Sequence, residues 1–151
     1  MPVEDRPPAE VAYPALNGRA WWIGESSDAL ARLEALPAGF SPGDFLVGGH
    51  RCGEGAERRI VLELVSAGVG ALLGASFDPA FFALAIEMGL PAVAIEEVRA
   101  IRDGDSLRLD IESYRVVNHS SGDRYVIRNL TDAELERYRV FYHGGTLGRA
   151  G

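Results

Sequence analysis

The sequence predicts an α/β fold of three layers, in which helices flank a parallel sheet and a second, antiparallel sheet backs it. Between residues 18 and 95, short apolar runs alternate with segments of helical spacing, and the connections are short. This order builds right-handed β-α-β units and therefore a parallel sheet. Beyond Arg99 apolar and polar residues alternate one by one, which is typical of half-exposed antiparallel strands.

The parallel part begins with a strand at 18–24, which is rich in aromatic and β-branched residues. Ser26 or Ser27 is then expected to cap a short helix that ends at Pro37. Uninterrupted apolar runs predict buried strands, and helical spacing of apolar residues predicts the helices between them. These elements are strands at 45–47, 71–73 and 92–95 and helices at 57–67 and 79–89, the second after an Asp78 cap.

The antiparallel part is expected to be a meander followed by one helix. Its helix starts at Thr131, where Glu134 completes a capping box, and ends at the glycine pair 144–145. The first fifteen residues hold four prolines and predict an extended arm (1–15), so the domain itself spans residues 16–151. The strands of the meander are predicted at 107–111, 114–117 and 124–127, with a turn at 120–123.

Composition bounds the function. A chain of 151 residues holds one domain, so two full catalytic domains are excluded. The net charge of −7 opposes binding to nucleic acid or to anionic membranes. All fifteen basic residues are arginine, which excludes chemistry that needs a lysine, such as a Schiff base. Neither a membrane-spanning run nor a signal peptide is recognisable, so we expect a cytoplasmic protein.

Cysteine and histidine are sparse. Cys52 is the only cysteine, so an internal disulfide is excluded. No metal site is expected in this chain, and a zinc ion or an iron–sulfur cluster would need ligands from a partner. His50 and Cys52 are close enough in sequence to suggest a Cys–His nucleophile, but an ordinary loop thiol is the simpler interpretation because no third group orients the pair. His119 and His143 are isolated.

The most informative segment is the loop from Gly49 to Arg59, between the first buried strand and its helix. Its glycines let the backbone approach a ligand, and the helix start offers free N–H groups with a partial positive charge. Arg51, Arg58 and Arg59 add the chemistry of a carboxylate or phosphate site. The alternative is a tight strand-to-helix turn that carries surface arginines.

Several segments of the chain match one known family. They are Gly18-Arg19-Ala20, Gly43 to Gly49, Gly53-Glu54-Gly55 with Arg58, Ala67 to Ala71, Ser76-Phe77, and Ala85 to Pro91. Through these segments the sequence resembles the small subunit of 3-isopropylmalate dehydratase, which is equivalent to the swivel domain of the aconitase superfamily, over about residues 17 to 147. The resemblance implies a swivelling β/β/α domain, hydro-lyase activity on a small hydroxy-dicarboxylate in leucine biosynthesis, and a large subunit that carries a [4Fe–4S] cluster.

In this family the loop reads Gly-Cys/Glu-Gly-Ser-Ser-Arg-Glu, and its first serine is the catalytic base. Here the two serines fall on Ala56 and Glu57, and the substrate-binding arginine falls on Arg58. The base is therefore missing. Glu57 is a candidate substitute base, and the alternative is a surface residue that complements the helix dipole. The substrate-binding residues that the resemblance implies are Gly53, Glu54, Gly55, Ala56, Arg58 and Arg59.

Two other family motifs are altered. Ser76-Phe77-Asp78-Pro79 replaces Ser-Phe-Ala-Arg, and only residues 25–28 remain of the longer segment after the first strand. Two functions stay open. The chain is either a divergent hydro-lyase subunit that pairs with a large subunit in a heterodimer or larger assembly, or a non-catalytic paralogue, a pseudoenzyme. The second would bind a small carboxylate or serve as an assembly module, with a homo-oligomer possible for the isolated chain.

Overall fold

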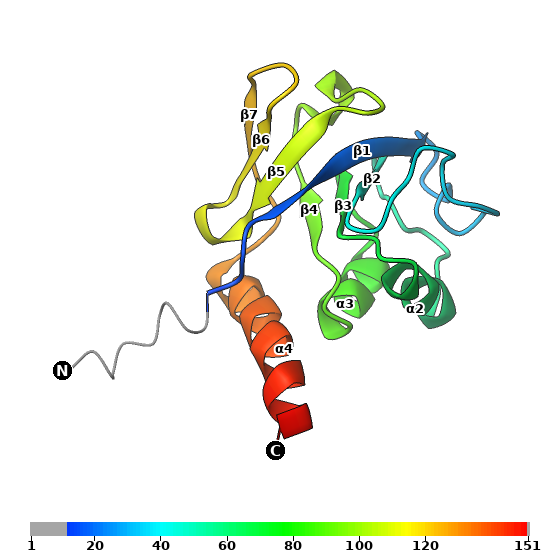
Figure 1. Cartoon of the computed structure of the whole chain (residues 1–151). Helices are drawn as coiled ribbons and strands as arrows, with labels where there is room; N and C mark the ends of the chain where they lie inside the picture. Colours follow the sequence, from blue (N-terminus) through cyan, green and yellow to red (C-terminus); the bar gives the residue numbers. More distant parts are fainter. Residues whose placement is uncertain (1–11, 151) are drawn as a thin grey trace.

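The computed structural model describes the backbone of residues 12–150 and the side chains of residues 12–143. Seven strands form one mixed sheet in the order β4-β3-β2-β1-β5-β6-β7 (Figure 1). β1 to β4 run parallel, and β5 to β7 are antiparallel to their neighbours. The strands are Leu16–Gly24 (β1), Phe45–Gly48 (β2), Ala71–Gly74 (β3), Ala92–Ala94 (β4), Ser106–Asp110 (β5), Arg115–Asn118 (β6) and Arg124–Val126 (β7).

The parallel strands and the antiparallel meander are confirmed, but the prediction of a second sheet is wrong. β1 has nine residues and β2 has four. The later part of β1, from Ala20, pairs with β2, while Leu16 to Arg19 pair with β5 on the opposite edge. Unpaired backbone groups on a strand edge need partners. The first part of the long β1 therefore pairs with β5, and the meander joins the same sheet.

The described part of the chain also contains three α-helices, and each begins near its predicted residue. Asp78 caps α3 by accepting a hydrogen bond from the Phe81 amide, at 3.2 Å, as its position before a proline predicts. Thr131 and Glu134 form the expected capping box of α4. The helices are Arg58–Ser66 (α2), Pro79–Glu87 (α3) and Asp132–Ala150 (α4), with short 3₁₀ turns at Val98–Ala100 and Ile111–Ser113.

Two helix predictions are wrong. The segment after β1 forms consecutive turns instead of a helix, because the Ser27 carbonyl, which a helix would bond within the segment, accepts the Glu54 amide at 3.1 Å. Leu30 of this segment is nevertheless buried. At the other end, α4 continues through the glycine pair 144–145, since glycine costs a helix only about 1 kcal/mol. Figure 1 shows this helix extending away from the sheet.

The sheet has an inner and an outer face. Its inner face encloses the larger core, to which the parallel strands contribute Val47, the antiparallel strands Val116 and α4 Tyr138. One sheet therefore curves around this core and supplies the walls that two sheets were expected to supply. On the outer face of β2 and β3, a second cluster lies beneath α2 and α3 and includes Leu46 and Val61. The outer face of β5 to β7 has no such helical cover in Figure 1.

The predicted arm falls mostly on residues 1–11, which lie outside the described residues. Its last part is packed onto α4. The Tyr13 amide donates a hydrogen bond to Glu112 at 2.6 Å, and the Tyr13 ring packs edge-on against Tyr138 at 6.4 Å between centroids. Glu112 in turn accepts two hydrogen bonds from Arg139. Among the described residues, no helix is both long and apolar enough to cross a membrane.

Candidate anion site at the strand-to-helix corner

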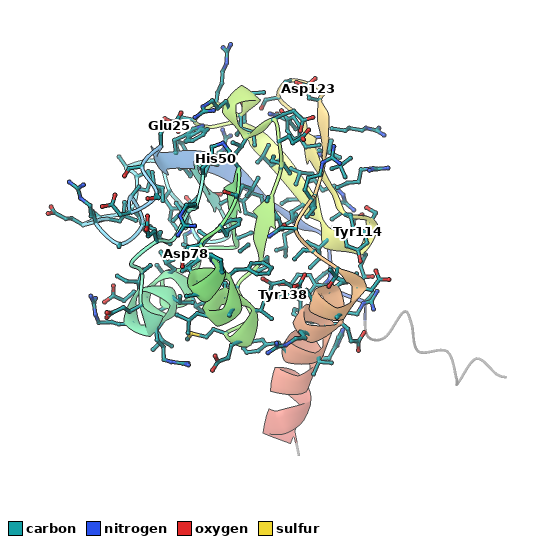
Figure 2. The ribbon with its side chains drawn as sticks, turned by 180° about the vertical axis from the view of Figure 1, so that it is seen from behind. Glu25, His50, Asp78, Tyr114, Asp123 and Tyr138 are labelled. Carbon is teal, nitrogen blue, oxygen red and sulfur yellow. The ribbon has the colours of Figure 1, made fainter. Side chains whose placement is uncertain are left out.

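The candidate site lies where the parallel strands end. In open α/β sheets, ligands bind at the carboxyl ends of the strands, where the loops converge. The loop after β2 is bound there to the loop after β3, because the Cys52 amide donates to the Ser76 carbonyl at 2.9 Å and the Asp78 amide donates to the Cys52 carbonyl at 3.0 Å. Figure 2 shows Glu25, His50 and Asp78 on this side of the molecule. Residues 53–59 are called the corner below.

Glycine is required at Gly53. Its φ is +94°, and a Cβ there would lie 2.3 Å from Cγ of Phe81. Phe81 is buried in the outer core, so its ring cannot move aside. The loop backbone therefore packs directly on α3, which a side chain at position 53 would prevent. Gly55 also has a positive φ, of +82°.

The start of α2 is open to solvent. Its N-cap, Glu57, is extended and exposed, and its side chain makes no capping hydrogen bond. The first amides of a helix have no acceptor within the helix, so this end of α2 presents unsatisfied N–H groups. Ala56, at the position of the family's base, is 7% exposed and packs into the outer core. Glu57 is thus the carboxylate that borders these amides.

The three arginines of the predicted site each contact a carboxylate. Arg58 and Glu87 are about half exposed and join α2 to α3. Arg51 is strained, with a φ of +50°, and reaches the helix cap of α3. The nearest nitrogen–oxygen distances are 3.1 Å for Arg51 and Asp78, 2.9 Å for Arg58 and Glu87, and 3.0 Å for Arg59 and Glu63.

The remaining predicted residue is Glu54, which is exposed and accepts a hydrogen bond from the Ser27 hydroxyl. The structure thus gathers all the predicted site residues at one corner, but it turns each arginine toward a carboxylate of the chain itself. Glu87 was not anticipated as a site residue. It lies 29 positions from Arg58, and only the packing of α2 against α3 brings the two together.

Cys52 and His50 do not form a nucleophilic pair. Cys52 is 3% exposed and packs against Gly48, and burial raises the pKa of its thiol to about 12. At neutral pH the thiol is therefore protonated. His50 is exposed and faces the Ser76 hydroxyl at 3.5 Å instead. The interpretation as an ordinary loop thiol accounts for this geometry.

Two cavities lie near the corner without including it. One, of about 180 Å³, is lined mainly by apolar residues of the 30–36 segment and α2, and the other, of about 520 Å³, lies beside the end of β1. The corner itself lines neither of them. Within the described part of the chain, no three His, Cys, Asp or Glu side chains are grouped to hold a metal ion.

Comparison with known proteins gives a consistent result. A scan against models of protein families matches none of them. The chain is 36% identical over 107 residues to 3-isopropylmalate dehydratase small subunit 2 of Archaeoglobus fulgidus, a match that covers 70% of this chain and 62% of that protein. It is 34% identical over 115 residues to 3-isopropylmalate dehydratase small subunit 1 of Thermotoga maritima, covering 72% of this chain and 69% of the relative.

The fold agrees with these relatives. The solved structure of a 3-isopropylmalate dehydratase from Methanocaldococcus jannaschii matches with a TM-score of 0.71 and 20% sequence identity, over 91% of this chain and 100% of that one. The chain spans about three fifths of the length of the Archaeoglobus relative and a little more than two thirds of the Thermotoga one. From this identity, the chain belongs to the family of 3-isopropylmalate dehydratase small subunits.

Proposed function

We propose that the chain is the divergent small subunit of an isopropylmalate-dehydratase-like hydro-lyase, acting in the cytoplasm with a large subunit that carries a [4Fe–4S] cluster. Family membership supports this proposal, and so does the position of the corner at the carboxyl ends of the parallel strands. The described residues do not themselves form a site for such a cluster. The role of this chain is therefore to bind and orient a small hydroxy-dicarboxylate.

The observation that carries the proposal is the uncapped start of α2 with Arg58 in its first turn. Free amides and the helix dipole favour a carboxylate at this position, and a guanidinium adds two parallel hydrogen bonds. The ion pair of Arg58 with Glu87 does not prevent this. It is half exposed, and pairs of that kind contribute about 0–1 kcal/mol, so a substrate carboxylate can replace Glu87 at little cost.

Proton transfer falls to Glu57 in this proposal. Dehydration removes a proton from a carbon next to a carboxylate, and the base must lie beside the bound carboxylate. Ala56 has no acceptor and is buried, whereas Glu57 is exposed at the edge of the same amides. Its side chain caps no helix amide and is free to turn toward a ligand.

A second function is favoured by one observation. The methyl group of Ala56 packs into the apolar outer core, so the family's base position has become part of the scaffold. A non-catalytic paralogue that binds a carboxylate and assembles with a partner would need the amides and Arg58 of the corner but no base at position 56. The two functions differ only in whether Glu57 transfers a proton.

Both functions require the corner to bind a carboxylate. Calorimetry tests this by measuring the binding of 3-isopropylmalate to the complex with the large subunit of the same organism. Arg58→Gln is expected to weaken binding at least about tenfold, because it removes a charge-assisted contact. Glu87→Gln is expected to tighten binding roughly two- to fivefold, because it removes the internal competitor of the substrate. Arg32→Gln, at an exposed position outside the corner, is the control. Equal affinities for all four proteins would refute the site.

Dehydration of 3-isopropylmalate by the same complex, and the addition of water to the alkene that forms, separate the two functions. If Glu57 is the base, Glu57→Gln lowers kcat by about 10²- to 10⁴-fold and leaves KM nearly unchanged, while Glu57→Asp retains part of the rate. Glu34→Gln, at another exposed glutamate, is the control. Binding without any turnover by the unaltered complex would select the non-catalytic paralogue.

A further inference from the structure

The outer face of the antiparallel strands carries a cluster of arginines. Along these strands, alternate residues point outward, and the pairing register places Arg108 opposite Val117 and Val117 opposite Arg124 on one row. Arg115 lies on the next row, opposite Asp110 and Val126. All three arginines are exposed. Arg108, Arg115 and Arg124, with Arg19 of the neighbouring β1, are called the arginine face below.

The charge of this face is not balanced within the chain. Among the ion pairs and hydrogen bonds of residues 12–143, none involves the side chain of Arg108, Arg115 or Arg124. Asp110, the carboxylate on the same face, caps the Ser113 amide at 3.3 Å. Arg19 donates to the Gly104 carbonyl. An acidic protein thus keeps several unpaired positive charges together on one sheet face.

Among the described elements, the outer face of the sheet is covered by helices over the parallel strands but not over the antiparallel strands (Figure 1). Over β2 and β3, α2 and α3 pack on the outer side and form the outer core. Over β5 to β7 the outer side carries valines between the arginines, with Val126 39% exposed. Neighbouring strands of a sheet are about 4.8 Å apart, so the face is several side chains wide. Arginine is enriched in protein interfaces because its planar head group binds carboxylates in pairs of hydrogen bonds.

We infer that the arginine face is a docking surface for an acidic surface of the large subunit; this inference rests on the proposed function for the identity of the partner. Charge complementarity selects an acidic protein. Nucleic acid is a poorer fit, because the chain as a whole has a net charge of −7 and the face has no aromatic residue on which a base would stack. The face is separate from the corner, so docking and substrate binding depend on different arginines.

The test uses the full chain and the large subunit, with the dissociation constant measured by biolayer interferometry. The triple variant R108Q/R115Q/R124Q is expected to bind at least about tenfold more weakly, because it removes the three unpaired charges. The control R32Q/R128Q/R137Q removes the same net charge from exposed positions elsewhere and is expected to change affinity less than roughly threefold. The lysine variant R108K/R115K/R124K keeps the charge and is expected to recover much of the affinity.

Salt and self-association give independent readouts. Raising the salt from about 0.05 to about 0.3 M is expected to weaken the unaltered complex, and the triple variant is expected to show a smaller salt effect. Because the three side chains are exposed and have no partner among the described residues, the triple variant is expected to keep its melting temperature. Equal binding by the triple variant and its control would overturn the inference. So would a failure of the unaltered chain to bind the large subunit, or self-association or nucleic-acid binding that the triple substitution abolishes.

Two outcomes separate this inference from the proposed catalytic function. If the triple variant loses binding but the unaltered complex does not dehydrate 3-isopropylmalate, the docking surface stands and the hydro-lyase function falls. If the unaltered complex is active and the triple variant binds as tightly as its control, the hydro-lyase function stands and the docking surface falls.

Discussion

Two regions of this molecule concentrate arginine, and they differ in how its charge is balanced. At the corner and the loop that leads to it, Arg51, Arg58 and Arg59 each contact a carboxylate of the chain. On the arginine face, three arginines have no partner among the described residues. The loop has the sequence signature of an anion site, yet the arginines without an ion-pair partner lie on the outer face of the antiparallel strands. Residue type and spacing therefore do not reveal which positive charges are available to a partner.

The loop that leads to the corner contains the buried Cys52. The largest expected effect is on the alkylation rate of this thiol. Burial raises the pKa of the Cys52 thiol to about 12, so at pH 8 the thiolate fraction is expected to be roughly a thousandfold lower than for a free thiol. Alkylation by iodoacetamide is expected to be slower by at least that factor in the folded chain than in guanidinium. Because Cys52 is the only cysteine, the alkylation rate measures this residue alone. A folded-state rate near that of a free thiol would show that the loop is not closed onto the sheet.

The backbone of the loop is more constrained than the hairpin turn beside the arginine face. Gly53→Ala forces a Cβ onto the Phe81 ring at a positive φ and is expected to lower the free energy of unfolding by about 3 kcal/mol. Gly122→Ala, in the turn between β6 and β7, has a φ of +85° but open space around it, so only about 1 kcal/mol is expected. Urea denaturation measures both. Equal losses would contradict the contact between loop and α3.

The ion pair of Arg139 shows how burial affects the contribution of an arginine ion pair to the free energy of unfolding. Its pair with Glu112 is about three-quarters buried, whereas the pairs at the corner are about half exposed. Hydrogen bonds from Arg139 lower the pKa of Glu112, so the pair stabilises the fold above the unfolded pKa of about 4.3, and this stability is lost as the pH falls through the lower folded pKa. Glu112→Gln is expected to cost about 1–2 kcal/mol at pH 7.

Urea denaturation at several pH values checks this dependence. The stability difference between the unaltered chain and Glu112→Gln is expected to shrink progressively as the pH falls below the unfolded pKa of about 4.3. It is expected to be smallest below the lower folded pKa, where Glu112 is protonated in both the folded and the unfolded chain. A difference that stays constant down to pH 2 would mean that the ion pair contributes nothing to stability.

The smallest effects concern single arginines. Arg58→Gln removes an exposed ion pair and is expected to destabilise the chain by less than about 1 kcal/mol. Arg115→Gln removes a charge that forms no ion pair among the described residues. Asp110 lies directly opposite Arg115, whereas Arg108 and Arg124 lie one row away, so the attractive and repulsive effects are expected to cancel to within a few tenths of a kcal/mol. Thermal denaturation at low salt compares the two variants. A destabilisation by Arg115→Gln equal to that of Arg58→Gln would show that the face is balanced after all.

Local patterns predicted much of this fold because they act over a few residues. The apolar runs at β2 to β4, the Asp78 cap and the capping box at Thr131 each depend on near neighbours, and all are present in the structure. The segment after Ser27 failed because its helix competes with a hydrogen bond to Glu54, which is 27 positions away. The second sheet failed for the same kind of reason, since β1 is long enough to pair with β5.

The corner divides in the same way. Its glycines and the start of α2 were evident along the chain. The pairing of Arg58 with Glu87 was not, because it depends on the packing of two helices, and neither was the arginine face, whose members come from three strands.

The sequence alone determined the α/β character of this protein and the motifs of its family, since both depend on short-range spacing and residue type. Only the tertiary structure decided that the sheet is continuous, that Cys52 is buried, and which arginines keep their charge unbalanced. Those properties arise from contacts between segments far apart in the chain, and the energy of such contacts depends on geometry that local pattern does not contain.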